Sequence, residues 1–217
     1  MSFPDQDEDG FGPDDVIRLT GVSRETFSRV RAYLDLLDVW RTRINLIGPS
    51  EGRHLWRRHV YDSLQLLDLI GPGVKTIADL GSGAGFPGIV LACALADRAD
   101  FSVTLVEKSV RKAEFLQAAV DAVRLPAVVR NQRIEDTHPV RVDLVTARAL
   151  APLPKLLALA EGWMRPGGQA VFLKGREAAS ELTLARESWT FDISARASMS
   201  SPDGQVLAIS FLKRRAK

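Results

Sequence analysis

The sequence predicts an α/β protein with one main core, built on an open and mostly parallel sheet. From residue 74 onward, short apolar runs alternate with helical patterns, as in chains that wind helices around a central sheet. The first apolar run, Thr76–Leu80, passes directly into the glycine-rich segment Gly81–Gly88. The second run ends at Glu107, 26 positions beyond Gly81. At 217 residues and 46% hydrophobic composition, the chain can bury one such core together with a helical appendage.

The charge of the chain is unevenly distributed. Residues 1–15 hold six acidic residues and no Lys or Arg, with several Pro and Gly and little to bury, so we expect this segment to be disordered. The remainder has 29 Lys and Arg against 21 Asp and Glu, a net charge of about +8. This excess favours a polyanionic partner such as nucleic acid; the alternative is a generally basic surface with no such role.

Residues 16–73 predict a helical segment ahead of the sheet. Ser23 can cap a helix whose apolar residues, from Phe27 to Leu37, recur at helical spacing. A break over Arg41–Pro49 follows, and Glu51 resumes the helical pattern. Basic residues gather around this break beside a tryptophan, which suits phosphate contacts and base stacking, although a solvated helical face remains the alternative. The candidate RNA-binding residues are Arg41, Arg43, Arg53, Arg57, Arg58 and His59.

The sequence leaves the roles of Asp62 and His59 open. Asp62 and Ser63 are good helix-start residues, so for Asp62 helix capping competes with a catalytic role. The role of His59 is equally ambiguous. The three histidines and Cys93 form no metal-ligand pattern, so we expect no metal site. A single cysteine in an apolar stretch fits a reducing cytoplasm. No signal peptide and no apolar run of roughly 20 residues is found, so we expect a soluble cytoplasmic protein with no membrane partner.

The rest of the chain continues the alternation of strands and helices. Four further helices are expected, over Ile89–Ala96, Val110–Val123, Leu153–Ala160 and Glu177–Glu187. The expected strands after the first are Phe101–Glu107, Ala127–Arg130, Val142–Ala147, Gln169–Gly175, Trp189–Ala195 and Val206–Phe211, with the last two forming an antiparallel pair.

Two strand-end residues are candidates for ligand binding, because the carboxyl ends of parallel strands line the ligand crevice in such sheets. Glu107 stands where a carboxylate can accept hydrogen bonds from the two hydroxyls of a nucleoside ribose. Arg148 directly follows a strand and can hold a carboxylate or phosphate; a surface salt bridge is the alternative.

The glycine loop is compatible with two classes of ligand. Gly83–Gly88 satisfies the dinucleotide pattern G-x-G-x-x-G, which on its own is weak evidence for a nicotinamide enzyme. Asp79 extends the pattern to D-x-G-x-G-x-G, and Pro87 lies within the loop. An acid at the mouth of the loop would repel a pyrophosphate, whereas it suits the cationic sulfonium of S-adenosylmethionine.

Asp79–Gly85 and Glu107 resemble motif I and the second-strand acid of class I S-adenosylmethionine methyltransferases. This resemblance implies a Rossmann-like, seven-stranded, mostly parallel sheet with an antiparallel last strand. Five segments, one of them the glycine loop itself, occur in the order found in the RsmG (GidB) family of 16S rRNA guanine-N7 methyltransferases. The matching segments are Ile44–Leu46, His59–Leu64, Gly81–Gly88, Arg133–Glu135 and Ala147–Ala149. The resemblance spans roughly Ser23 to Lys213 and implies a methyltransferase domain over residues 74–217. Residues 16–73 then form a substrate-contact segment.

The resemblance also implies residue roles. Gly81 and Phe86 belong to the cofactor loop with Gly83 and Gly85, and Asp79 lies beneath the methionine end of the cofactor. Glu107 takes the ribose, while Ile134 and Glu135 flank the adenine. Arg148 lies close to both cofactor and substrate. Ile47 departs from the family, which often has Thr there, and the region Gly48–Leu55 is unusually rich in arginine.

The expected chemistry is methyl transfer to guanine N7, which carries a free lone pair and needs no general base. The chain has no Asn or Asp followed by two prolines after the fourth strand, as exocyclic-amine methyltransferases commonly have, and its only cysteine is Cys93. The resemblance implies G527 of 16S rRNA, in the usual rRNA numbering, as the target, with rRNA or the small ribosomal subunit as partner. We expect the enzyme to be a monomer. The alternatives are a methyltransferase for a small molecule or protein, and a non-catalytic nucleotide- or RNA-binding module.

Overall fold

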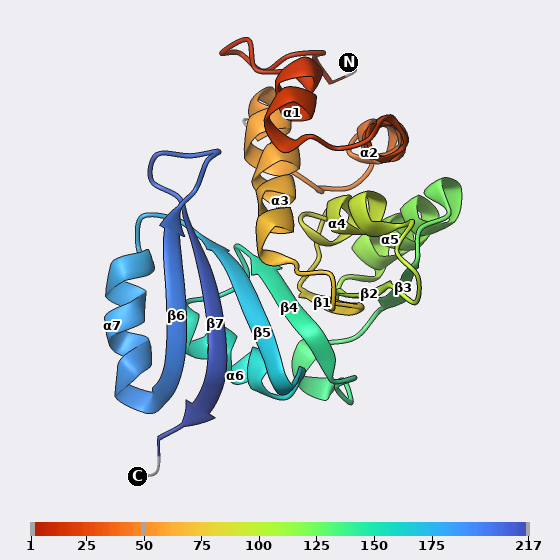
Figure 1. The fold of residues 1–217 in the computed structure, drawn as a ribbon. Coiled ribbons are helices and arrows are strands. Elements are labelled where there is room, and N and C mark those ends of the chain that lie inside the picture. The colour runs from red at the N-terminus through yellow and green to blue at the C-terminus, as the bar shows by residue number, and fades with distance from the viewer. Residues whose placement is uncertain (1–2, 49–50, 216–217) are drawn as a thin grey trace.

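The computed structural model describes residues 3–48 and 51–215 and contains one seven-stranded sheet (Figure 1). Pro49, at the end of the predicted helix break, and the outermost two residues at each end of the chain lie outside this description. The strand order is β3-β2-β1-β4-β5-β7-β6, and only the pairings of β7 with β5 and β6 are antiparallel. This confirms the predicted fold class. The strands are β1 (Thr76–Leu80), β2 (Ser102–Val106), β3 (Ala127–Arg130), β4 (Val142–Arg148), β5 (Met164–Lys174), β6 (Trp189–Ala197) and β7 (Gln205–Arg214).

Helices cover both faces of the sheet, and the strands alternate between two apolar clusters. Ile77 and Leu144 belong to the cluster on the side of α2, α4 and α5, whereas Ala78 and Val145 belong to the cluster formed with α6. Successive residues of a strand point to opposite faces, so strands buried on both faces need the continuous apolar runs that the sequence has. The helices that follow strands are α4 (Gly88–Leu95), α5 (Val110–Val123), η4 (Ile134–Asp136), α6 (Leu153–Glu161) and α7 (Ala178–Ser188).

The N-terminal segment is helical, as predicted, and packs beside α4 and α5 (Figure 1). The Ser23 hydroxyl accepts a hydrogen bond from the Thr26 amide, which confirms the predicted cap. The Tyr33 hydroxyl on α2 donates to the Ala84 carbonyl at 2.5 Å and so ties this segment to the glycine loop. The helices are α1 (Pro13–Thr20), α2 (Arg24–Trp40), η1 (Glu51–His54), the π-helical turn η2 (Trp56–Tyr61), α3 (Asp62–Leu64) and η3 (Gln65–Leu69).

Residues 3–15 are packed against the rest of the protein, so the prediction that this segment is disordered is wrong. The Asp7 carboxylate is buried and accepts hydrogen bonds from the amides of Trp56 and Arg57 at 3.0 and 2.8 Å. Phe11 is 5% exposed and contacts Tyr61, with 5.5 Å between ring centroids. The composition predicted a solvated tail. Instead, the buried ring of Phe11 and the Asp7 carboxylate at the start of a helical turn hold the segment against the rest of the protein.

Strand β5 is longer than predicted. It starts at Met164, paired with Val142, and the register then jumps to Leu144 opposite Gln169. The residues between, including Gly167 at a φ of +77°, form an irregular bulge within the strand rather than a turn ahead of it.

Candidate active site

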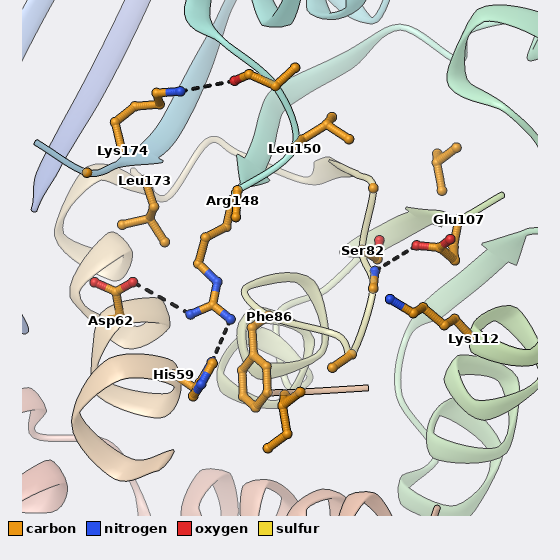
Figure 2. A pocket seen from close by; sticks show the side chains of 18 of the residues that line it. His59, Asp62, Ser82, Phe86, Glu107, Lys112, Arg148, Leu150, Leu173 and Lys174 are labelled. Atoms are coloured by element: carbon orange, nitrogen blue, oxygen red, sulfur yellow. Dashed lines mark hydrogen bonds and ion pairs between the residues drawn. The ribbon is translucent and has the colours of Figure 1, made fainter. Parts of the chain in front are cut away.

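A pocket of about 680 Å³ opens at the carboxyl ends of the central strands (Figure 2). Its volume falls within the roughly 300–1,000 Å³ typical of small-molecule sites. One side is formed by the loops after β1, β2 and β3, and the other by residues from β4, the N-terminal helical segment and the loop between β6 and β7. The pocket therefore lies where parallel strands of a doubly wound sheet place their ligands.

The glycine loop forms the floor of this pocket. Gly81 and Gly83 line it with φ values of +70° and +57°, which other residues rarely adopt. At Gly81 a Cβ would also lie 2.6 Å from a methyl group of Leu150. Gly85 instead packs against Ile89 and the Tyr33 hydroxyl and is not brought to the pocket. Of the predicted loop residues, Gly81, Gly83 and Phe86 therefore reach the ligand space, whereas Gly85 supports the loop from behind.

Asp79 lies beneath the loop rather than at its mouth. It is 1% exposed and does not line the pocket; its Oδ1 accepts a hydrogen bond from the Thr146 hydroxyl at 2.8 Å. Its other oxygen lies against Gly88, where an added Cβ would approach it to 2.7 Å. Burial raises the pKa of Asp79 to about 6. The carboxylate can therefore act on a bound cation through its field but is not exposed to touch it.

Glu107 faces the pocket with a fixed carboxylate. The amides of Gly83 and Ser109 donate to its two oxygens, Oε2 at 2.9 Å and Oε1 at 2.8 Å. Each carboxylate oxygen can accept a further hydrogen bond, so the group remains able to take ribose hydroxyls. The next two predicted residues also line the pocket from η4, after β3: Ile134 is half-buried and Glu135 is exposed.

Arg148 lies on the opposite side of the pocket from Glu107 and contacts the N-terminal helical segment (Figure 2). Its Nη1 donates to the Arg58 carbonyl at 2.7 Å, and its Nη2 lies 2.6 Å from His59 Nδ1. The Asp62 carboxylate is 3.8 Å from Nη1, and the guanidinium lies over the Phe86 ring, 5.3 Å from its centroid. Arg148 is thus held by several contacts, which excludes a loose surface salt bridge as its role.

His59 is an internal partner of Arg148 rather than a surface residue. It is 3% exposed, and burial together with the nearby arginines lowers its pKa to about 3. The imidazole is therefore neutral near pH 7, and Nδ1 accepts from Arg148 while Nε2 carries the proton. The structure does not support His59 as a direct RNA contact.

The five candidate RNA-binding arginines fall into two groups. Arg43 and Arg58 are exposed, and Arg58 lines the pocket. The other three each have an acidic partner: Arg41 pairs with Asp38 at 2.7 Å, Arg53 with Glu8 at 3.1 Å and Arg57 with Asp9 at 2.9 Å. The acidic N-terminal residues thus offset part of the positive charge that the sequence pattern singled out.

Several pocket residues were absent from the sequence prediction. Lys174 lies at the end of β5, with Nζ 2.6 Å from Glu181 and 3.0 Å from the Ala151 carbonyl, and the rule that strand ends line the crevice could have found it. Lys112 and Lys155 also line the pocket. Ser198 and Ser200 lie in the β6–β7 loop and contact Asp62 across 136 and 138 positions, a pairing that carries no sequence signal.

The role of Asp62 differs from helix capping. The η2 turn runs directly into α3, so Asp62 lies within a continuous helical segment and its side chain reaches the β6–β7 loop.

Among the described residues no group of three or more His, Cys, Asp and Glu is placed to hold a metal ion. No helix in residues 3–48 and 51–215 is long and apolar enough to cross a membrane. Cys93 is buried, and burial raises the pKa of its thiol to about 12.

Two solved structures share this fold. The TYW2 protein of M. jannaschii, solved with AdoMet, matches 82% of this chain and 81% of its own with a TM-score of 0.57 at 14% identity. An O-methyltransferase from Bacillus cereus, solved with SAH, matches 84% of this chain and 90% of its own with a TM-score of 0.57 at 16% identity. At these identities the similarity concerns the fold alone.

Sequence relatives are much closer. The family model GidB, rRNA small subunit methyltransferase G, matches residues 26–207. A protein named ribosomal RNA small subunit methyltransferase G from Paramagnetospirillum magneticum is 46% identical over 94% of this chain and 97% of its own length. The protein of the same name from Hyphomonas neptunium is 47% identical over 89% and 92%. With the glycine loop, Glu107 and Arg148 gathered in one pocket, these matches establish that the chain belongs to the rRNA small subunit methyltransferase G family.

Proposed function

We propose that this protein transfers the methyl group of S-adenosylmethionine to N7 of a guanine in 16S rRNA, at G527 by family resemblance. The observation that carries the proposal is the pairing, in one pocket, of a nucleoside-binding side with an arginine-containing side. The first side contains the glycine loop and Glu107, and the second contains Arg148, His59 and Asp62.

The nucleoside-binding side fits the cofactor. Glu107 holds the ribose hydroxyls with a carboxylate that two main-chain amides keep in place. Ile134 and Glu135 flank the adenine at the rim. Asp79 beneath the loop favours a positive charge above it, since its ionised form is otherwise destabilised by burial. When bound, the cofactor supplies a sulfonium-activated methyl group.

The residues on the other side supply position rather than acid–base chemistry. Guanine N7 has a free lone pair, so its attack requires no proton removal. His59 is neutral and already accepts a hydrogen bond from Arg148, so it is not available as a base. Arg148 is held in place to direct the guanine or a phosphate of the RNA. Alignment in such a site can contribute about 7–11 kcal/mol to lowering the barrier.

Charge at the pocket entrance is consistent with RNA as the substrate. Arg58 and Lys112 line the pocket, and Arg43 is exposed on the N-terminal segment. We infer that these side chains contact phosphates of the small-subunit RNA. We also propose that the enzyme is a monomer.

The test is transfer of labelled methyl groups. The protein and labelled S-adenosylmethionine are incubated with small ribosomal subunits, naked 16S rRNA and bulk protein, and the labelled nucleoside is identified. Label on a guanine as 7-methylguanine is expected. Label on adenine or on protein would contradict the proposal, and cofactor binding with no label on any substrate would favour a non-catalytic module.

A further inference from the structure

The Asp62 carboxylate is anchored through one oxygen and presents the other to the pocket. Its Oδ1 accepts hydrogen bonds from Gln65 Nε2 at 2.7 Å, from the Ser198 hydroxyl at 3.1 Å and from the Ser200 hydroxyl. Its Oδ2 lies 3.8 Å from Arg148 Nη1 (Figure 2). Three donors on one oxygen fix the orientation of the group, and the second oxygen then points toward Arg148 and the pocket.

The Oδ2 atom keeps its capacity to accept hydrogen bonds. A separation of 3.8 Å exceeds hydrogen-bond length, so Arg148 attracts this oxygen without occupying its lone pairs. Both terminal nitrogens of Arg148 are committed elsewhere, Nη1 to the Arg58 carbonyl and Nη2 to His59. In the part of the chain that the structure describes, the hydrogen bonds to the Asp62 carboxylate all end on Oδ1.

The side chains that hold Asp62 are themselves held by further hydrogen bonds. Gln65 Nε2 also donates to the Ser198 hydroxyl at 3.1 Å, and the Met199 amide donates to Gln65 Oε1 at 3.0 Å. The β6–β7 loop is thereby joined to α3 and η3 by side chains that also carry Asp62. The carboxylate is 13% exposed, so a donor that reaches it from the pocket competes with little water.

A guanine offers the donors that such an oxygen lacks. Its N1–H and its exocyclic N2 amine stand side by side on the Watson–Crick edge, whereas adenine presents an acceptor at N1. Guanine N7 lies on the other side of the base. Figure 2 shows Asp62 and Glu107 on opposite sides of the pocket, with Arg148 and Phe86 between them. A base that points its Watson–Crick edge at Asp62 therefore turns N7 toward the side that holds the cofactor.

We propose that Asp62 is a specificity-determining residue whose Oδ2 accepts hydrogen bonds from N1–H and the N2 amine of the target guanine. The assignment rests on the proposed function. It gives the enzyme a reason to select guanine that is separate from the reactivity of N7, because a buried carboxylate left without its donors is costly.

The test replaces guanine by inosine, which lacks only the N2 amine. Small subunits are reconstituted with 16S rRNA carrying guanine or inosine at the methylated position, and kcat/KM is measured for both. The wild-type protein should prefer guanine by about tenfold, the size expected for one well-made polar contact. In the Asp62→Asn variant this ratio should fall toward one, while the affinity for S-adenosylmethionine stays within about twofold.

The matched control is Asp68→Asn. Asp68 is an exposed acid of the same helical segment, paired with Arg196 at 3.5 Å, and it does not line the pocket. Its variant should keep the wild-type ratio of guanine to inosine. A purely structural role for Asp62 would lower methylation of both RNAs equally and leave their ratio unchanged.

Two results would overturn the assignment: equal use of both RNAs by the wild-type protein, or an Asp62→Asn variant that binds cofactor and keeps the wild-type ratio. If that variant does not fold, subunits carrying N1-methylguanine decide, since the wild-type protein should methylate them at least about tenfold more slowly. An unchanged rate on N1-methylguanine would also contradict the assignment. A wild-type protein inactive on guanine would instead overturn the proposed function, and the assignment with it.

Discussion

The two sides of the pocket are built in different ways. On the cofactor side, Glu107 and Gly83 are 24 positions apart, and the contacts join a side chain to main-chain amides. On the other side, Arg148 meets His59 across 89 positions, and Ser200 reaches Asp62 across 138. The cofactor side is formed by residues that lie close together in the sequence, around the glycine loop. The second exists only once the N-terminal segment and the last hairpin have packed against the sheet.

This difference separates their expected contributions. The cofactor side offers carboxylates and backbone groups to a ligand that carries a positive charge, so its residues should govern cofactor affinity. The other side offers an arginine held by a neutral histidine and an anchored acid, so its residues should govern transfer to the RNA. Four changes test this division, from the largest expected effect to the smallest.

Replacing Arg148 by Ala should reduce methyl transfer by about 100-fold, because it removes a positioned charge from the reacting region. The affinity for S-adenosylmethionine should change by less than about threefold. Single-turnover label transfer and calorimetric cofactor binding measure the two quantities. Arg98→Ala is the matched control, since Arg98 also donates to a backbone carbonyl, that of Gly71, away from the pocket. An Arg148→Ala variant with wild-type transfer would remove Arg148 from the site.

Replacing Glu107 by Gln should weaken cofactor binding by about tenfold, the loss expected when charged hydrogen bonds to hydroxyls become neutral ones. The rate at saturating cofactor should stay close to that of the wild-type protein. Cofactor titration followed by transfer assays at saturation separates the two effects. Glu114→Gln, at an exposed position of α5, serves as the control. A variant that binds normally but transfers slowly would reverse the division between the two sides.

Lowering the pH from 7.5 to 5 should weaken cofactor binding by about fivefold, since Asp79 takes up a proton below its raised pKa of about 6 and loses its attraction for a cation. The same raised pKa means that folding stability due to Asp79 decreases as the pH rises from about 4 to about 6. His59, with a pKa of about 3, does not titrate in the native protein over the range of the binding measurement. Because that pKa lies below the usual value of 6.5, folding stability due to His59 decreases as the pH falls from about 6.5 to about 3. Binding titrations across pH measure the effect, and the Asp79→Asn variant should show a flatter profile. Equal pH profiles for both proteins would exclude Asp79 as the cause.

The smallest expected effect concerns the arginines of the N-terminal segment. Arg58→Ala should weaken RNA binding by about threefold and lower the slope of log affinity against log salt by about one, as expected for one lost phosphate contact. Arg53→Ala should do less, because Glu8 already pairs with Arg53 at 3.1 Å. RNA-binding titrations at several salt concentrations compare the two. A larger loss for Arg53 than for Arg58 would show that the acidic segment moves aside when RNA binds.

The same contrast explains what could be predicted from the sequence. The strands, their order of appearance and the antiparallel last pair follow from apolar runs and turns, which are local properties. The loop at Gly81 and the acid at Glu107 stand at characteristic spacing, so they were found together. Arg148 was found because it directly follows a strand, and strand ends line the crevice.

What the sequence did not predict depends on packing between distant segments. Local patterns could not distinguish His59 on a surface from His59 buried against Arg148, and they could not join Asp62 to the β6–β7 loop. The acidic start was mistaken for a free tail because composition does not reveal that Asp7 finds two amides at the start of a helical turn. In each case the partner is many residues away.

The most direct test of the account is a structure of the protein with S-adenosylhomocysteine bound. We expect the ribose hydroxyls to contact Glu107, the adenine to lie at Ile134, and the sulfur to face Arg148 and Asp62. A ribose bound away from Glu107, or a sulfur turned away from Arg148, would contradict it.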